Sequence, residues 1–235
     1  MLRNDYSKNN DKSTKPALII FARYPRKGKV KTRLAEDTGE DFAYNFYKLC
    51  SENILNEVEK LSGFDKYLFY ADEADRNKII DWIGNDFFYV PQSTNDLGHR
   101  MLSAFETVFN RGAGSAIIIG TDVPDLNNST IKKAEMQLQE NDLVIGPACD
   151  GGYYLLGMKK PYKELFYNIE WGMGSVFQST INNAKELNLK THLVDKLYDI
   201  DTINDLRLWL SGTNNKALKE KVRELNKQLY TNITE

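Results

Sequence analysis

Cysteine and long hydrophobic segments are scarce in this sequence. Its two cysteines, Cys50 and Cys149, lie far apart, which argues against a disulfide framework and favours a reducing cytoplasm. No apolar run approaches the roughly 20 residues that span a bilayer, and the polar N-terminus lacks the apolar core of a signal peptide. We therefore expect a cytoplasmic protein without a membrane span.

Net charge and histidine are also low, which disfavours two further classes. The formal net charge of -2 argues against a general nucleic-acid-binding protein, which would need an excess of cations. His99 and His192 are the only histidines that could serve a Cys149 nucleophile as a base, and no motif links either of them to that thiol. We therefore expect direct displacement rather than thiol catalysis.

Short apolar runs do alternate with helical patterns along most of the chain. The expected strands are residues 17–22, 67–70, 87–90, 117–120 and 143–147, and the expected helices are residues 42–61, 74–83, 100–109 and 130–138. This alternation predicts a mostly parallel sheet with right-handed crossovers. A short strand at 153–157 can run antiparallel, so we predict an α/β fold of three α/β/α layers around a mixed sheet.

The length favours one domain with extensions at both ends. We expect a disordered or loose tail at residues 1–15 and one α/β domain at 16–212. A charged helix at 213–235 is expected to pack on the same domain through one apolar stripe. Shorter elements are expected within the last part of the domain, with helices at 176–187 and 203–210 and a strand at 192–194.

A carboxylate closely follows the fourth expected strand. The apolar run ends at Gly120, and Asp122 comes two residues later. Ligands of open α/β sheets bind outside the carboxyl ends of the strands, so Asp122 is a candidate metal ligand. The alternative is an aspartate that only stabilises the turn. Ser129 or Thr130 is expected to cap the helix that follows.

Six cations lie in the eleven residues after the first expected strand, namely Arg23, Arg26, Lys27, Lys29, Lys31 and Arg33. Such a loop suits a polyphosphate, whose charge needs several donors, and Gly28 lets the backbone approach a ligand closely. It is not a Walker A motif, because Arg23 stands where that motif needs a glycine and Val30 where it needs serine or threonine. We predict phosphate binding, with a solvated basic loop as the alternative.

Two further loops combine a carboxylate with glycine. Asp96-Leu97-Gly98 precedes a helix, where its backbone amides could approach a base, ribose or phosphate, or where Asp96 could simply cap the helix. Asp150-Gly151-Gly152 follows the fifth strand, and its glycines remove side chains where a ligand could pass near the backbone. The alternative for the second loop is an ordinary hairpin turn.

The remaining candidates lie in the last third of the chain. Asp199 and Asp201 are two positions apart on an extended segment, so their carboxylates point the same way and could hold Mg²⁺ or Mn²⁺. Alternatively, Asp201 or Thr202 caps the next helix; both roles can hold, with Asp201 more exposed to a ligand than Asp199. Trp171, beside two glycines, could stack on a sugar or an acceptor, or be a packed aromatic.

Taken in order, these motifs resemble the DUF2064 family, whose members are also called radical-SAM/selenodomain-associated transferases. The resemblance spans roughly residues 16–210 and rests on Phe21–Pro25 with Gly28, Val30–Leu34, Asp96–Gly98 with Arg100-Met101, Ile119–Asp122 with Pro124–Leu126, Gly146–Ala148, Asp150–Leu155, Trp171, and Asp199–Thr202 with Asp205-Leu206. Two positions depart from the family pattern: Asn95 stands where a glycine is expected, and Met173 where a threonine is expected.

The resemblance implies a GT-A fold of the nucleotide-diphospho-sugar transferase type, related to phospholactate and molybdenum-cofactor guanylyltransferases. It implies nucleotide contacts from Ala22, Arg23, Gly28, Lys31, Thr32, Arg33, Asp96, Gly98, Arg100 and Thr121. It implies acceptor contacts from Asp150, Gly151, Gly152, Tyr153 and Trp171. Asp122 would bind Mg²⁺ or Mn²⁺, with Asp201 as the second ligand.

We therefore predict a metal-dependent transferase with a nucleotide-activated donor and a small-molecule acceptor. Either an acceptor phosphate attacks a nucleoside triphosphate and pyrophosphate leaves, or an acceptor hydroxyl attacks a sugar nucleotide and a nucleoside diphosphate leaves. Lys31 and Arg33 are expected to offset the charge of the leaving group, and Asp150 to contact the acceptor or act as a base. The alternative is a non-catalytic nucleotide-binding or scaffold protein of the same fold.

Overall fold

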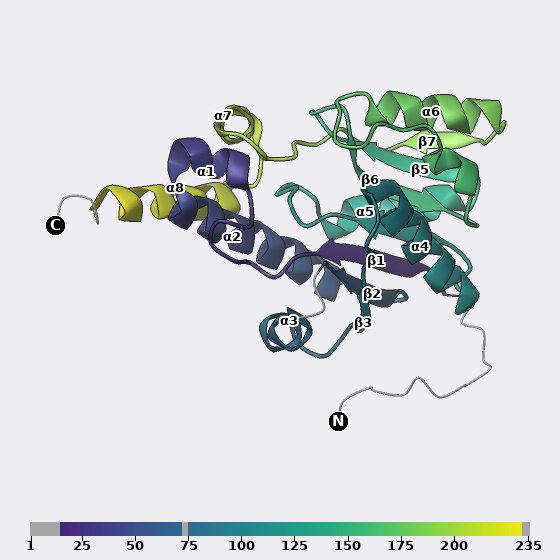
Figure 1. Cartoon of the computed structure of the whole chain (residues 1–235), viewed down its shortest axis with the longest axis horizontal. Helices are drawn as coiled ribbons and strands as arrows, with labels where there is room; N and C mark the ends of the chain where they lie inside the picture. The colour runs from purple at the N-terminus through teal and green to yellow at the C-terminus, as the bar shows by residue number, and fades with distance from the viewer. Residues whose placement is uncertain (1–14, 72–74, 232–235) are drawn as a thin grey trace.

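A mixed sheet forms the centre of the part of the chain that this computed structural model describes, residues 15–71 and 75–231, with side chains described up to residue 225. Its seven strands lie in the order β3-β2-β1-β4-β6-β5-β7 (Figure 1). In chain order they are β1 (Ala17–Ala22), β2 (Asp65–Tyr70), β3 (Phe88–Pro91), β4 (Ala116–Ile119), β5 (Leu143–Pro147), β6 (Tyr153–Met158) and β7 (Thr191–Leu193). Only β6 runs antiparallel to its neighbours among these strands, which confirms the predicted mixed sheet.

The helices connect these strands largely where the apolar spacing placed them. They are α1 (Thr32–Thr38), α2 (Glu40–Glu59), α3 (Arg76–Ile83), α4 (Leu97–Asn110), α5 (Asn128–Leu138), α6 (Val176–Glu186), α7 (Ile203–Gly212) and α8 (Lys216–Thr231), with a 3₁₀ helix, η2, at Lys163–Phe166. No helix in the described ranges is long and apolar enough to cross a membrane. The expected tail at 1–15 lies outside the described residues, apart from Lys15.

Three local expectations were wrong. The cationic loop ends sooner than expected, because α1 begins at Thr32. Helix α4 begins at Leu97 rather than at residue 100, because the Asp96 carboxylate accepts a hydrogen bond from the His99 backbone amide at 2.8 Å. Helix α5 is capped by Asn127, whose side chain accepts from the Thr130 amide at 3.1 Å, and not by Ser129 or Thr130.

Both faces of the sheet are covered, which explains why its central strands are apolar at every position. In β1, Leu18 and Ile20 pack under α2, α3 and α5, and Ile19 packs under α4 on the opposite face. These three side chains are fully buried. Because adjacent strand residues point to opposite faces, a sheet between two helical layers needs apolar residues throughout.

A third core cluster lies beyond the edge of the sheet. Figure 1 shows α1, α7 and α8 gathered around the end of α2 on one side of the molecule. Leu34 of α1, Phe46 of α2, Trp209 of α7 and Leu218 of α8 are buried together there, with Ile200 from the segment before α7. This cluster fixes the start of α1 and the approach to α7 against the carboxyl ends of the strands.

Candidate functional site

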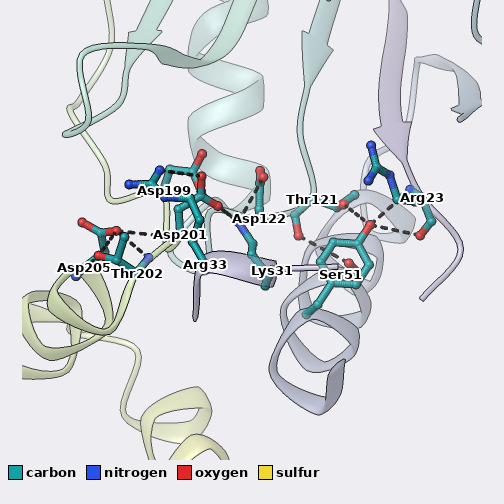
Figure 2. Close-up of polar contacts among 11 residues, drawn as sticks. Arg23, Lys31, Arg33, Ser51, Thr121, Asp122, Asp199, Asp201, Thr202 and Asp205 are labelled. Carbon is teal, nitrogen blue, oxygen red and sulfur yellow. Dashed lines mark hydrogen bonds and ion pairs between the residues drawn. The ribbon is translucent and has the colours of Figure 1, made fainter. Parts of the chain in front are cut away.

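Three aspartates meet where the loop after β4 contacts the segment that leads into α7. Asp122 comes from the first, and Asp199 and Asp201 from the second (Figure 2). Each offers one carboxylate oxygen, and these oxygens all lie within 4.8 Å of one another. Ile200 between the last two is fully buried in the third core cluster, so its neighbours on the extended chain point the other way, towards Asp122.

The Lys31 ammonium lies among these carboxylates. Its Nζ is 2.7 Å from Asp201 Oδ1, 3.2 Å from Asp199 Oδ1 and 3.3 Å from Asp122 Oδ2. The Lys31 side chain is 5% exposed. The backbone of Lys31 is left-handed, with φ 45° and ψ 47°, at the position just before α1. We call Lys31, Asp122, Asp199 and Asp201 the aspartate–lysine cluster.

The cluster carries more negative than positive charge. Burial alone would lower the pKa of the Lys31 ammonium, but the three carboxylates offset this effect and hold that pKa well above its usual range. Burial raises the pKa of Asp199 well above its usual range, and the charge of Asp122 raises it further, while Lys31 opposes the rise. One ammonium does not compensate three ionised carboxylates, so the cluster favours either a proton on Asp199 or a further cation.

The donor set fits a hard divalent cation. Carboxylate oxygens are the ligands that Mg²⁺ and Mn²⁺ prefer, and the three that converge here come from two loops at the carboxyl edge of the sheet. All three were candidates from the sequence: Asp199 and Asp201 by their spacing, and Asp122 by its place after a strand, with the family resemblance implying Asp122 and Asp201. The Asp199 side chain is 22% exposed against 43% for Asp201, in line with the expectation that Asp201 faces a ligand more openly.

The capping alternative for the 199–202 segment holds alongside this arrangement. Thr202 caps α7 by accepting from the Asp205 amide, while the Asp205 carboxylate accepts from the Thr202 amide at 2.8 Å. The Asp201 carboxylate does not take part in this cap: its Oδ1 accepts from Lys31, and the exposed Arg33 guanidinium lies 3.8 Å from its Oδ2. Thr202 thus fixes the helix start and leaves Asp201 in the cluster.

Helix α2 fastens the first loop to the loop that carries Asp122. The Tyr47 hydroxyl donates to the Arg23 carbonyl at 3.0 Å, accepts from the Arg23 amide at 3.1 Å and lies 3.4 Å from Thr121 Oγ1. One turn later, Ser51 Oγ donates to the Thr121 carbonyl at 3.4 Å. Our sequence reasoning missed both side chains. The signal available was a buried serine and a tyrosine hydroxyl on the otherwise apolar face of α2.

Three other cations of the first loop, Arg23, Arg26 and Lys27, have acidic or backbone partners, and Lys29 is exposed. Arg26 forms an ion pair with the buried Asp75, and Lys27 with Asp41. The Arg23 guanidinium donates to the Lys29 carbonyl at 3.3 Å, and Figure 2 shows it beyond Thr121, apart from Lys31. Of the six cations, only Lys31 and Arg33 form ion pairs with the aspartates of the aspartate–lysine cluster among the described residues.

The other residues that we expected to contact the nucleotide differ in burial and in their partners. Ala22 is buried at the end of β1, and Thr32 is exposed at the first position of α1. Gly28 has φ 69°, in the region that favours glycine, and its backbone lies against Glu40. The Arg100 guanidinium donates to the Asn95 carbonyl at 2.6 Å, which ties it to the turn before α4.

A second contact at the carboxyl edge is steric rather than ionic. A Cβ atom on Gly98, at the start of α4, would lie 2.4 Å from the Trp171 ring. A Cβ on Gly151 would lie 2.0 Å from the Gly174 carbonyl oxygen, and Gly151 has φ 93°. We call Gly98, Gly151, Trp171 and Gly174 the glycine–tryptophan contact. It holds the start of α4, the turn after β5 and the segment before α6 together.

Two of the five residues assigned to the acceptor side, Gly151 and Trp171, belong to this contact, and the other three lie next to it in sequence or in the same layer. Trp171 is half-buried and stacks on Phe166, with ring centroids 6.3 Å apart, as a packed aromatic would. The Tyr153 hydroxyl lies 3.8 Å from Met101 Sδ in the same layer. Asp150 is exposed, and its carboxylate accepts from the Gly152 amide at 2.9 Å, which is the hydrogen bond of a turn-forming aspartate.

Comparison with known proteins identifies the class. A Desulfovibrio desulfuricans G20 protein, provisionally assigned as a nucleotide-diphospho-sugar transferase, matches with TM-score 0.84 and 32% identity over 92% of this chain and 98% of that chain. The 2-phospho-L-lactate guanylyltransferase of Methanocaldococcus jannaschii is 28% identical over 75% of each chain. The manganese complex of a Mycobacterium tuberculosis H37Rv protein shares the fold, with TM-score 0.53 and 10% identity over 85% of this chain and 100% of that chain. The chain is a transferase with the nucleotide-diphospho-sugar transferase fold, which confirms the predicted class.

The family follows from a direct match. The model of the family described as "Uncharacterized protein conserved in bacteria (DUF2064)" matches residues 54–173, and the chain belongs to this family. The resemblance of the sequence motifs is thereby confirmed. The matched range contains Asp122, Asp150 and Trp171, whereas Lys31 and the 199–202 segment lie outside it.

Proposed function

We propose that this protein is a divalent-metal-dependent transferase that acts on a nucleotide-activated donor. The observation that carries the proposal is the aspartate–lysine cluster, in which three carboxylates from two loops converge beside Lys31 at the carboxyl edge of the sheet. Open α/β sheets bind their ligands at this edge. Manganese in the complex of another protein of this fold supports the choice of cation.

Transfer of a nucleotidyl group from a nucleoside triphosphate to a phosphorylated acceptor is our first candidate reaction. The similarity to a 2-phospho-L-lactate guanylyltransferase favours it. Glycosyl transfer from a sugar nucleotide is the second candidate, because the relative that is 32% identical is assigned to the nucleotide-diphospho-sugar transferases. In both reactions the leaving group is an anionic phosphate, so the same arrangement of charge serves either one.

The residues of the chain take the following roles in this proposal. Asp122, Asp199 and Asp201 hold the cation, which when bound supplies charge compensation for the leaving group. Lys31 and the exposed Arg33 bind the phosphates. The nucleotide is lined by Ala22, Arg23, Gly28, Thr32 and Thr121. Tyr47 and Ser51 hold the first loop and the loop after β4 in fixed relative positions. The charged groups on these loops are thereby preorganised, and preorganised charge stabilises a transition state more than a ground state.

The acceptor would be bound nearer to the glycine–tryptophan contact. Asp150 is the exposed carboxylate there, and we propose that it contacts the acceptor or accepts its proton. Gly152 would let an acceptor approach the backbone of this turn, whereas Gly151 and Trp171 would hold the turn in place through packing. Asp96, Gly98 and Arg100 at the start of α4 would lie between the nucleotide and this acceptor region.

Product analysis tests the proposal and separates its two forms. The protein is incubated with Mg²⁺ or Mn²⁺ and either each nucleoside triphosphate or each common sugar nucleotide, and slow hydrolysis is followed without an added acceptor. Released pyrophosphate indicates nucleotidyl transfer, and a released nucleoside diphosphate indicates glycosyl transfer. Tight nucleotide binding with no turnover in any mixture would instead favour a non-catalytic nucleotide-binding protein.

A further inference from the structure

The Lys31 ammonium contacts the same carboxylate oxygens that a divalent cation would bind. Its Nζ lies 2.7 Å from the Asp201 oxygen, and a Mg²⁺ ion binds such an oxygen at about 2.1 Å. A cation held by the same oxygen would therefore lie within about 5 Å of the ammonium. The Lys31 side chain is 5% exposed, so little water separates the two charges and their repulsion is strong.

We propose that Lys31 stands in for the divalent cation in the metal-free protein and leaves the three aspartates for the donor phosphates when the cation binds. The proposal rests on the proposed function, because it takes the metal and the phosphate from there. With neither Lys31 nor a cation between them, the three carboxylates would repel one another, so either positive charge can hold the loop after β4 beside the segment before α7.

The backbone of Lys31 fits a residue that changes position. A left-handed conformation is uncommon for lysine and persists only where its surroundings fix it. Here the ion pairs to Asp122, Asp199 and Asp201 are the contacts that fix the side chain. Lys31 also immediately precedes α1, so its release would let Thr32 and Arg33 adjust around a phosphate. Cation and nucleotide binding would then favour each other, as reciprocal linkage requires.

Titration with Mn²⁺ alone tests the competition. Free Mn²⁺ is measured by electron paramagnetic resonance in the wild-type protein and in Lys31→Met, with no nucleotide present. We expect Lys31→Met to bind Mn²⁺ at least about tenfold more tightly, because the competing charge is gone. Lys29→Met is the matched control, since it removes a charge from an exposed side chain of the same loop, and it should bind like the wild type.

Each alternative outcome has a separate meaning. Equal Mn²⁺ affinity of folded Lys31→Met and wild type would overturn the role of Lys31 and leave the metal site standing. Weaker binding by Lys31→Met would also overturn it, because Lys31 would then support the site rather than compete for it. Absence of Mn²⁺ binding in both proteins, with and without nucleotide, would overturn the metal dependence of the proposed function as well.

A second measurement uses the wild-type chain and does not depend on a folded variant. Lys31 is nearly inaccessible among the three carboxylates, whereas Lys29 is exposed. Acylation of lysine amines, followed by mass spectrometry, should therefore be slow at Lys31 and become several times faster when Mn²⁺ is added without nucleotide, because no phosphate is then present to cover the released ammonium. The rate at Lys29 serves as the internal reference. A Lys31 rate that stays low while the metal is bound would contradict the proposed exchange.

Discussion

The aspartate–lysine cluster and the glycine–tryptophan contact both join loops at the carboxyl edge of the sheet, and they do so by different forces. In the first, four ionisable groups are held within hydrogen-bonding distance and their charges do not balance. In the second, two glycines admit a tryptophan ring and a backbone carbonyl at distances that no other residue allows.

The difference separates what each region contributes. A cluster of like charges costs stability unless cations offset it, which points to binding rather than folding as its role. Close packing without charge stabilises the fold and binds nothing by itself. We therefore expect substitutions in the cluster to change function with little loss of stability, and substitutions in the glycine–tryptophan contact to do the reverse.

The largest effect should come from Asp122→Asn. We expect transfer activity to fall about a thousandfold, which corresponds to about 4 kcal/mol of transition-state stabilisation. The thermal stabilisation that metal plus nucleotide gives, about 2.7 kcal/mol at 100 times Kd, should be lost as well. In the absence of ligands the unfolding free energy should stay the same or rise, because one of three neighbouring negative charges is removed.

Thermal denaturation with and without Mn²⁺ and nucleotide checks this prediction. Asp195→Asn is the matched control, since it removes the same charge from a carboxylate that is 79% exposed and outside the cluster. A ligand-dependent shift that survives in Asp122→Asn would show that Asp122 holds no metal. A large loss of stability without ligands would break the comparison, because the cluster would then be structural.

Gly151→Ala should have the next largest effect, on stability. Its new Cβ would lie 2.0 Å from the Gly174 carbonyl oxygen at a φ of 93°, so both packing and backbone oppose it. We expect the unfolding free energy to fall by about 3 kcal/mol in urea denaturation. Gly172→Ala is the control, because Gly172 has φ 87° with nothing within 4 Å of the added Cβ, and it should cost only about 1 kcal/mol.

Gly98→Ala should lower the unfolding free energy less than Gly151→Ala does, because the tryptophan side chain can shift more easily than a backbone carbonyl. The added Cβ would lie 2.4 Å from Trp171, and we expect a loss of about 2 kcal/mol in unfolding free energy. In a Trp171→Ala background the same change should become neutral or stabilising, since alanine favours a helix by about 1 kcal/mol over glycine. A double-mutant cycle measures this coupling, and additive effects would mean that the two residues do not constrain each other.

Arg33→Ala should have the smallest effect on stability. Its guanidinium is 68% exposed and lies 3.8 Å from Asp201, a geometry that contributes less than about 0.5 kcal/mol to folding. Nucleotide affinity, measured by calorimetry, should fall about threefold at low salt and less at high salt, because an exposed charge is screened. A loss that does not change with salt would assign Arg33 a contact other than an ionic one.

The sequence by itself determined the layers of this fold and the edge on which a site would form. Apolar runs such as 17–20 and 117–119 predicted strands buried on both faces, and Asp122 followed one of them directly. The spacing of Asp199 and Asp201 likewise predicted that both would point the same way, since alternation along an extended chain is a local property.

Only the tertiary structure decided which charges and which glycines meet. Lys31 is 91 positions from Asp122 and 170 from Asp201, so no local pattern indicates that its ammonium lies between them rather than in solvent with the rest of its loop. From their own sequence neighbours, Gly98 and Trp171 each allowed either a ligand contact or a purely structural role, and only packing across two loops shows that they contact each other. Local periodicity reports which face a residue takes, and contacts between distant segments depend on how the completed layers bring those faces together.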